Sequence, residues 1–158
     1  MILISSCLAG SMCRYNATHC LETKLHTLIK EKKAVMACPE LLGGLSTPRE
    51  PAEIQGGTGR DVLEGKAQVL TASGKDVTQA FINGANKTLA YARQINATLV
   101  VLKENSPSCG STSIYDGSFQ GVKQKGEGVT AALLRKEGFA VMSEEEFLQT
   151  WMSHSAED

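Results

Sequence analysis

The sequence has no long apolar run and no excess of charge of one sign. No hydrophobic stretch approaches the roughly 20 residues of a membrane span, and residues 1–4 lack both the basic flank and the length of a signal peptide. The formal net charge of −1 offers no broad basic surface for a nucleic-acid backbone. We therefore expect a cytoplasmic protein that acts on a small polar molecule, without membrane association or extensive nucleic-acid contact.

The compact motifs of several enzyme and metal-site classes are also missing. No Gly-x-Gly-x-x-Gly opens a helix after the first apolar segment, and the glycine-rich stretch 56–59 is not followed by Gly-Lys-Ser/Thr. Use of a nucleoside triphosphate is therefore not indicated. The five cysteines match no zinc-ribbon or ferredoxin spacing. Their odd number, without a secretion signal, argues against a disulfide framework.

The composition that is present, 42% hydrophobic and 21% charged in 158 residues, is that of one globular domain. We place this domain at residues 1–152 and a flexible tail at 153–158. Short apolar segments alternate with helical periodicity, which predicts an α/β fold: a single-domain, doubly wound (Rossmann-like), mostly parallel sheet with helices on both faces. The predicted strands are 2–6, 34–37, 98–102 and 139–142, and the predicted helices are 19–33, 77–95, 129–136 and one that begins with a capping box at Ser143.

Long irregular segments separate several of these elements. Glycine and proline are frequent after the second strand and glycine after the third, and loops of that length in a compact domain are usually functional or disordered. A short hairpin is expected at 62–71, around Gly65. Asp76 is expected to cap the helix at 77–95, which tolerates Gly84 at a cost of about 1 kcal/mol.

Four of the five cysteines follow predicted strands. Cys7 comes directly after the first strand and Cys13 lies in the loop beyond it, while Cys38 and Cys109 follow the second and third strands. Loops at the carboxyl ends of parallel strands converge on one crevice, so these thiols are expected to form a soft-metal site. Three thiolates suit an iron–sulfur cluster with one open iron, and four would close a zinc or cluster site. The alternative is a set of small buried hydrophobic side chains, which is the favoured interpretation for Cys20.

Two further candidates lie on the same loops. Glu40 follows Cys38 by two residues, and Ser106 precedes Cys109 by three. A carboxylate and a hydroxyl beside a metal and apolar walls can transfer protons. The alternatives are that Glu40 caps neighbouring backbone amides and that Ser106 is a turn residue before a proline.

The remaining polar candidates have weaker signals. Arg14 and Arg49 lie in irregular segments, where a guanidinium can bind a carboxylate, a phosphate or a carbonyl group. Arg60 is expected to be a solvated surface residue. Glu53 is expected to pair with one of these arginines or to shape its loop. His19 is interpreted as a surface residue at a helix start, which leaves little support for a Cys–His hydrolytic pair.

Six ordered motifs give nearly the whole chain a family resemblance. The motifs are Ser6-Cys7-Leu8-Ala9-Gly10 with Cys13-Arg14-Tyr15, the segment 38–45, the segment 48–54, Asp76-Val77-Thr78, the segment 106–110 and Tyr115-Asp116-Gly117. Together they resemble the bacterial domain of formerly unknown function that includes the thiouracil desulfidases. One departure is that Asn16-Ala17 stand where such proteins tend to have Asp-Gly.

The resemblance implies an oxygen-sensitive [4Fe-4S] cluster held by Cys7, Cys38 and Cys109, with Cys13 as the other candidate ligand. Its unligated iron would take sulfur from the thiocarbonyl carbon of a thiolated pyrimidine, in a non-redox hydrolysis that releases sulfide. Two rivals stay open on the residues themselves. They are a non-catalytic or regulatory metal-binding protein with a four-cysteine zinc or cluster site, and a metal-free thiol-redox or nucleophilic-cysteine enzyme.

The resemblance also implies roles for polar residues. Glu40 and Ser106 match the groups assigned to proton shuttling, and Arg14, Arg49 and Ser108 are expected to contact the substrate. Relatives that act on thiolated transfer RNA carry a further domain, and we expect no such domain here. This favours a free thiolated base, nucleoside or nucleotide as the partner.

Overall fold

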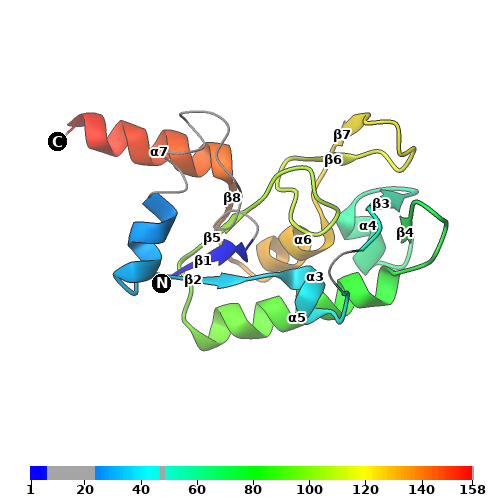
Figure 1. The fold of residues 1–158 in the computed structure, drawn as a ribbon, viewed down its shortest axis with the longest axis horizontal. Helices are drawn as coiled ribbons and strands as arrows, with labels where there is room; N and C mark the ends of the chain where they lie inside the picture. The colour runs from blue at the N-terminus through cyan, green and yellow to red at the C-terminus, as the bar shows by residue number, and fades with distance from the viewer. Residues whose placement is uncertain (7–23, 47–48, 158) are drawn as a thin grey trace.

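The computed structural model describes residues 1–6, 24–46 and 49–157 (Figure 1). Its centre is a four-stranded sheet in the order β2-β1-β5-β8, and every neighbouring pair of strands is parallel, as the sequence predicts. Among these residues no helix is long and apolar enough to cross a membrane. The strands are β1 (Ile2–Ser5), β2 (Ala34–Ala37), β5 (Leu99–Leu102) and β8 (Val141–Ser143).

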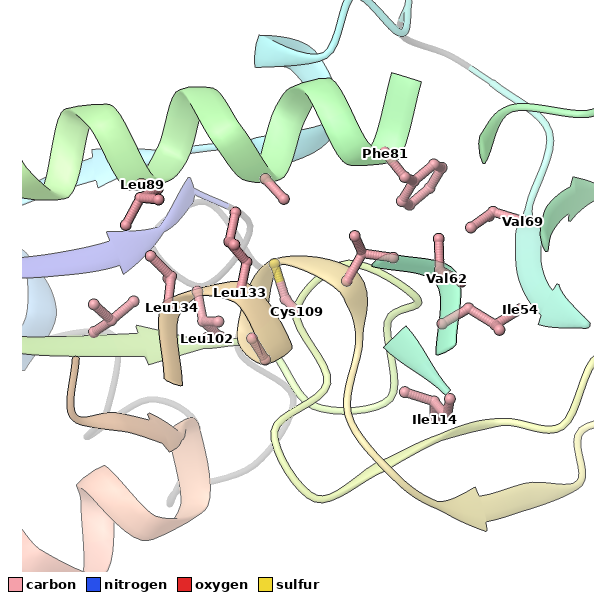
Figure 2. Packing of buried hydrophobic residues seen from close by; sticks show 14 of the residues in the cluster. Ile54, Val62, Val69, Phe81, Leu89, Leu102, Cys109, Ile114, Leu133 and Leu134 are labelled. Carbon is pink, nitrogen blue, oxygen red and sulfur yellow. The ribbon is translucent and has the colours of Figure 1, made fainter. Parts of the chain in front are cut away.

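Helices cover both faces of this sheet: α5 (Thr78–Gln94) and α6 (Val129–Lys136) on one face, α7 (Glu144–Glu157) and the helical segment 24–30 on the other. The cause is the alternation of apolar side chains along the strands. Leu3 and Val100 enter the core under α5 and α6. Figure 2 shows this core around Leu89, Leu102 and Leu134. Ile4 and Val101 enter a second core with Phe147 of α7. The doubly wound arrangement is therefore confirmed.

Several predicted element boundaries shift. The fourth strand occupies 141–143 rather than 139–142, because its pairing with β5 begins at Val141. The first predicted helix is described only over 24–30, and its start lies outside the described residues. The capping box of α7 is as predicted, with Glu146 donating its N–H to Ser143 Oγ at 3.2 Å. This helix continues to Glu157, into the segment expected to be a tail. The division into one domain and a tail stays a prediction.

Two antiparallel hairpins replace parts of the predicted loops. The expected hairpin at 62–71 is wrong, because Thr58 and Asp61 form a capping box that starts a helix, α4 (Gly59–Leu63). The strand that follows, β4 (Gln68–Thr71), pairs instead with β3 (Ala52–Gln55). The second hairpin, which the sequence did not predict, joins β6 (Ser113–Tyr115) and β7 (Lys123–Lys125). Both hairpins lie on the side of the molecule toward which β1 and β2 point (Figure 1).

A short helix, α3 (Pro39–Leu42), packs backbone to backbone against α5. A Cβ placed on Gly84 of α5 would lie 2.0 Å from the carbonyl oxygen of Pro39, and one on Gly43 would lie 2.0 Å from that of Ala80. Gly84 is therefore required by this contact and is not merely a tolerated interruption of the helix. The contact also fixes the position of Glu40, the second residue of α3.

We expect Gly84→Ala to lower the free energy of unfolding by about 1–3 kcal/mol, as overpacking does elsewhere. Alanine has the higher helix propensity, by about 1 kcal/mol, but the overlap with Pro39 outweighs that gain. Urea denaturation measures the change. Lys87→Ala, on the exposed side of α5, is the matched control and should change stability little. A Gly84→Ala protein as stable as wild type would contradict the close packing of α3 on α5.

Candidate active site

The carboxyl ends of β2, β1 and β5 are neighbours at one edge of the sheet, because β1 lies between the other two and all three are parallel. The chain passes from β1 to β2 on one side, and β5 adds on the other side, so the strand order reverses beside β1. In such sheets ligands bind in the crevice beyond the strand ends at this point. A cysteine follows each of these three strands in the sequence. Cys7 lies outside the described residues, as do Cys13, Arg14, His19 and Cys20.

Cys109 lies in the loop between β5 and β6, residues 103–112, which we call the Cys109 loop. The residue is only 2% exposed and belongs to the core under α5 and α6 (Figure 2). Its Sγ is 4.0 Å from the Oγ of Ser5, the last residue of β1. The Cys109 loop therefore folds back onto the end of the central strand.

Cys38 joins the end of β2 to α3. It is half-buried, and as the N-cap residue it keeps an extended backbone while its carbonyl oxygen accepts the N–H of Leu42 at 3.0 Å. Pro39 at the first helical position suits the start of a helix because its ring fixes φ and it has no N–H to satisfy. This local sequence sets Cys38 and Glu40 on the same turn. No group of three His, Cys, Asp or Glu side chains suited to a metal occurs in residues 1–6, 24–46 and 49–157, which hold two of the four predicted thiols.

Glu40 and Ser106, the two predicted proton-transfer residues, meet. Ser106 Oγ donates to Glu40 Oε1 at 3.4 Å, a contact between residues 66 positions apart in the sequence. Arg49 holds the other carboxylate oxygen, Oε2, with an Nε–Oε2 distance of 3.0 Å and a second bond from Nη2. Ser106 Oγ also accepts the N–H of Ser108 at 3.0 Å and that of Cys109 at 3.1 Å. These acceptor bonds leave the hydroxyl proton of Ser106 for Glu40.

A pocket of about 920 Å³ opens beside this pair. Glu40, Arg49 and Ser106 line it together with residues of both the β3–β4 hairpin and the strand β6. Glu53, in β3, lines it too and holds a loop other than its own, the one after β6: its Oε1 accepts the N–H of Gly117 at 3.0 Å and that of Phe119 at 3.1 Å. The volume is typical of small-molecule sites.

Two other predicted residues lie elsewhere. Ser108 is buried, and its Oγ shares a hydrogen bond of 2.8 Å with Thr130 of α6, so its side chain is directed into the core. Arg60 is exposed and pairs with Glu64 on the same helical turn, as expected of a surface residue. Substrate contact by Arg49, which lines the pocket, and by Ser108, which does not, stays a prediction.

Sequence reasoning missed Glu104, the second residue after β5. Burial of this carboxyl raises its pKa, but the N–H groups of Thr112 and Ser113 and the hydroxyls of Thr112 and Ser111 lower it more. The net pKa lies below the ordinary value. The run Ser111-Thr112-Ser113 after a glutamate was the only signal available in the sequence.

This lowered pKa predicts a pH dependence of stability. A carboxyl with a depressed folded-state pKa adds stability above its unfolded pKa, near 4.5, and loses that contribution as the pH falls through the folded value. We expect wild type to be more stable than Glu104→Gln at pH 7 and the difference to shrink below pH ~4.5. Urea denaturation at both pH values tests this, with Glu145→Gln, an exposed substitution, as control. A difference that stays constant with pH would be the contrary result.

Comparison with known proteins agrees with this geometry. The family model described as 2-thiouracil desulfurase matches residues 2–146. A protein of Bacillus subtilis (strain 168), the uncharacterized YbbK, is 65% identical over 146 residues, which are 92% of this chain and 97% of that protein. The solved structure of the [4Fe-4S]-dependent thiouracil desulfidase TudS (DUF523Vcz) matches with a TM-score of 0.77 and 37% identity, over 98% of this chain and 97% of the other. A family match of this extent, on a fold that gathers the motif residues Glu40 and Ser106 at the strand ends, means that the chain belongs to the 2-thiouracil desulfurase family.

Proposed function

We propose that this protein hydrolyses the C–S bond of thiolated pyrimidines without net redox change, using a [4Fe-4S] cluster, and releases sulfide. Membership of the 2-thiouracil desulfurase family supports this, as does 37% identity to a [4Fe-4S]-dependent thiouracil desulfidase. The observation that carries the proposal is the contact of Ser106 with Glu40 at the pocket wall. It joins two groups able to move protons on the two loops that hold Cys38 and Cys109.

The donor set suits the cluster. Soft thiolates select iron–sulfur clusters. Cys38 and Cys109 lie in the segments that follow β2 and β5, the two strands on either side of β1. The third proposed ligand is Cys7, which follows β1 in the sequence, with Cys13 as the alternative. When bound by three thiolates, such a cluster supplies one iron as a soft Lewis acid for the sulfur of the substrate.

The protein's own residues carry out the proton transfers. The Glu40 carboxylate takes a proton from the water that attacks the thiocarbonyl carbon, and Ser106, already hydrogen-bonded to Glu40, relays it. Arg49 holds Oε2 so that Oε1 faces the serine. The C=S double bond of the substrate is replaced by a C=O double bond, and both protons of the water leave with the sulfur as hydrogen sulfide. The balance needs no oxidant and no reductant.

The substrate is a small thiolated molecule, a free base, nucleoside or nucleotide of the thiouracil or thiouridine class. The pocket of about 920 Å³ has room for each of these. Reduced thiols holding an oxygen-sensitive cluster fit the reducing cytoplasm, where we place the protein.

Anaerobic reconstitution tests the proposal. Protein loaded with iron and sulfide should show the brown iron–sulfur absorption, bleach 2- or 4-thiouracil and release one sulfide per pyrimidine converted. Protein with a complete cluster that leaves every thiolated base, nucleoside and nucleotide unchanged would refute it. Metal bound by all four of Cys7, Cys13, Cys38 and Cys109, without turnover, would instead support a structural or regulatory metal protein.

A further inference from the structure

The Glu104 carboxylate accepts hydrogen bonds from the C-terminal end of the Cys109 loop and from the residue that follows it. Its Oε1 accepts the backbone N–H of Ser111 at 2.8 Å, of Thr112 at 3.0 Å and of Ser113 at 3.1 Å. Its Oε2 accepts the hydroxyls of Ser111 at 3.0 Å and of Thr112 at 2.9 Å. Five donors from three consecutive residues therefore converge on one side chain.

Further hydrogen bonds and a close backbone contact join the two ends of the Cys109 loop. Asn105 takes a left-handed conformation, with φ of 73°, and exchanges two bonds with Ser113: its N–H donates to the carbonyl oxygen at 3.2 Å, and its Oδ1 accepts the hydroxyl at 2.6 Å. Gly110 donates its N–H to the carbonyl oxygen of Ser106 at 2.9 Å. A Cβ on Gly110 would lie 2.5 Å from the carbonyl oxygen of Ser113, so the two arms of the loop approach too closely for any other residue.

Both functional side chains of the loop lie between these anchors. Ser106 and Cys109 fall after Glu104 and before Ser111, and the N–H of Cys109 is bonded to Ser106 Oγ. A shift of the 111–113 segment would therefore move the thiol and the hydroxyl together.

We infer that Glu104 is a positioning residue for the desulfuration reaction: it holds the Cys109 loop closed, so that Cys109 stays at the end of β1 and Ser106 stays in reach of Glu40. The inference rests on the proposed function for its consequence in catalysis, while its structural part can be tested without any cluster. Glu104 also lines the pocket, but donors of the loop occupy both of its carboxylate oxygens, so its proposed role is exerted through the loop.

The glutamine and alanine variants distinguish the hydrogen bonds of Glu104 from its charge. In Glu104→Gln the amide oxygen still accepts the three N–H groups, and the amide nitrogen donates to the two hydroxyls, which can turn to accept. In Glu104→Ala all five bonds are lost. Glu50→Ala is the matched control, because Glu50 lines the same pocket and accepts an N–H and a hydroxyl from Ser73, in a turn that carries neither cysteine nor Ser106.

The first measurement uses protein without cluster. Alkylation of Cys109 by iodoacetamide is followed by peptide mass spectrometry, with Cys38, half-buried, as the reference thiol in the same molecule. We expect Glu104→Ala to raise the Cys109 to Cys38 rate ratio at least ~10-fold, because a thiol that is 2% exposed reacts only when its loop opens. Glu104→Gln and Glu50→Ala should stay within ~3-fold of wild type. If Glu104→Ala does not fold, the pair Ser111→Ala and Thr112→Val, which removes two of the five donors, should give an intermediate rise.

The second measurement is the split between kcat and KM in reconstituted protein. Displacement of Ser106 should lower kcat of Glu104→Ala at least ~10-fold with KM nearly unchanged, and Glu104→Gln should restore most of it. An unchanged alkylation ratio in Glu104→Ala, or equal loss of kcat in the alanine and glutamine variants, overturns the inference. A wild-type protein with a full cluster and no turnover overturns the proposed function instead, and the alkylation ratio then still decides whether Glu104 holds the loop.

Discussion

Replacing Cys109 with alanine is expected to abolish both the brown absorption of the reconstituted protein and its turnover of thiouracil. Cys109 is one of three proposed ligands, and it is the only cysteine in the Cys109 loop, residues 103–112. With two thiolates left, iron retention should fall from about four atoms per chain to near zero, and kcat by at least ~10³-fold. Iron and sulfide analysis, the visible spectrum and the bleaching of thiouracil measure the effect.

The fold should survive this substitution. Cys109 is buried, but the change deletes a single heavy atom, which costs about 1 kcal/mol in stability, as for one buried methyl group. Cys20→Ala is a matched control of the same residue type, because the sequence predicts a structural role for Cys20, and it should keep the full cluster. Cys7→Ala and Cys13→Ala in parallel identify the third ligand. Full turnover by Cys109→Ala would refute its assignment as a ligand.

The central sheet could be predicted because its information is local. Leu99-Val100-Val101-Leu102 is an uninterrupted apolar segment, as expected of a strand buried on both faces, and it appears as β5. The parallel order then follows from the alternation with helices. The proximity of the two predicted proton-transfer residues could be predicted for the same reason, because loops at neighbouring strand ends lie close together. Ser106 does contact Glu40.

The hairpins could not be predicted, because their strands are defined by partners and not by their own sequences. Lys123-Gln124-Lys125 has no apolar alternation, and it is a strand only through its pairing with β6. In the same way, β4 pairs with β3, although α4 lies between these two strands in the sequence. Short polar strands of this kind carry little signal for a periodicity argument.

Side-chain pairs formed by loop closure were equally hidden. Arg49 was expected to bind substrate, and its bonds to Glu40 depend on the path of the chain after α3, because the two residues are nine positions apart in the sequence. Glu104 reads as an ordinary surface glutamate until the chain closes and brings three N–H groups to its oxygen. Residue type and spacing therefore indicated which loops hold the proposed site residues, while the hydrogen bonds that orient those residues depend on the three-dimensional path of the chain.

Glu40→Gln should lower kcat by about 10²–10⁴-fold while the protein keeps its full iron content. Glutamine fills the same space and its amide oxygen can still accept the hydroxyl of Ser106, but it cannot take a proton from water. The loss should therefore appear in kcat with KM little changed, because binding does not depend on proton transfer. Arg49→Met should give a smaller loss, since it removes the bonds that orient Glu40 without removing the carboxylate.

The control for Glu40 is Glu50→Gln, a carboxylate on the wall of the same pocket that bonds to Ser73 and not to Ser106. Its kcat should equal that of wild type within ~2-fold. Steady-state kinetics on 2- and 4-thiouracil, with iron analysis of each preparation, distinguish loss of chemistry from loss of cluster. Glu40→Gln with the kcat of wild type would show that another group moves the proton. Ser106 would then be left as a turn residue that orders the N–H groups of Ser108 and Cys109, the alternative that its sequence position before a proline had indicated.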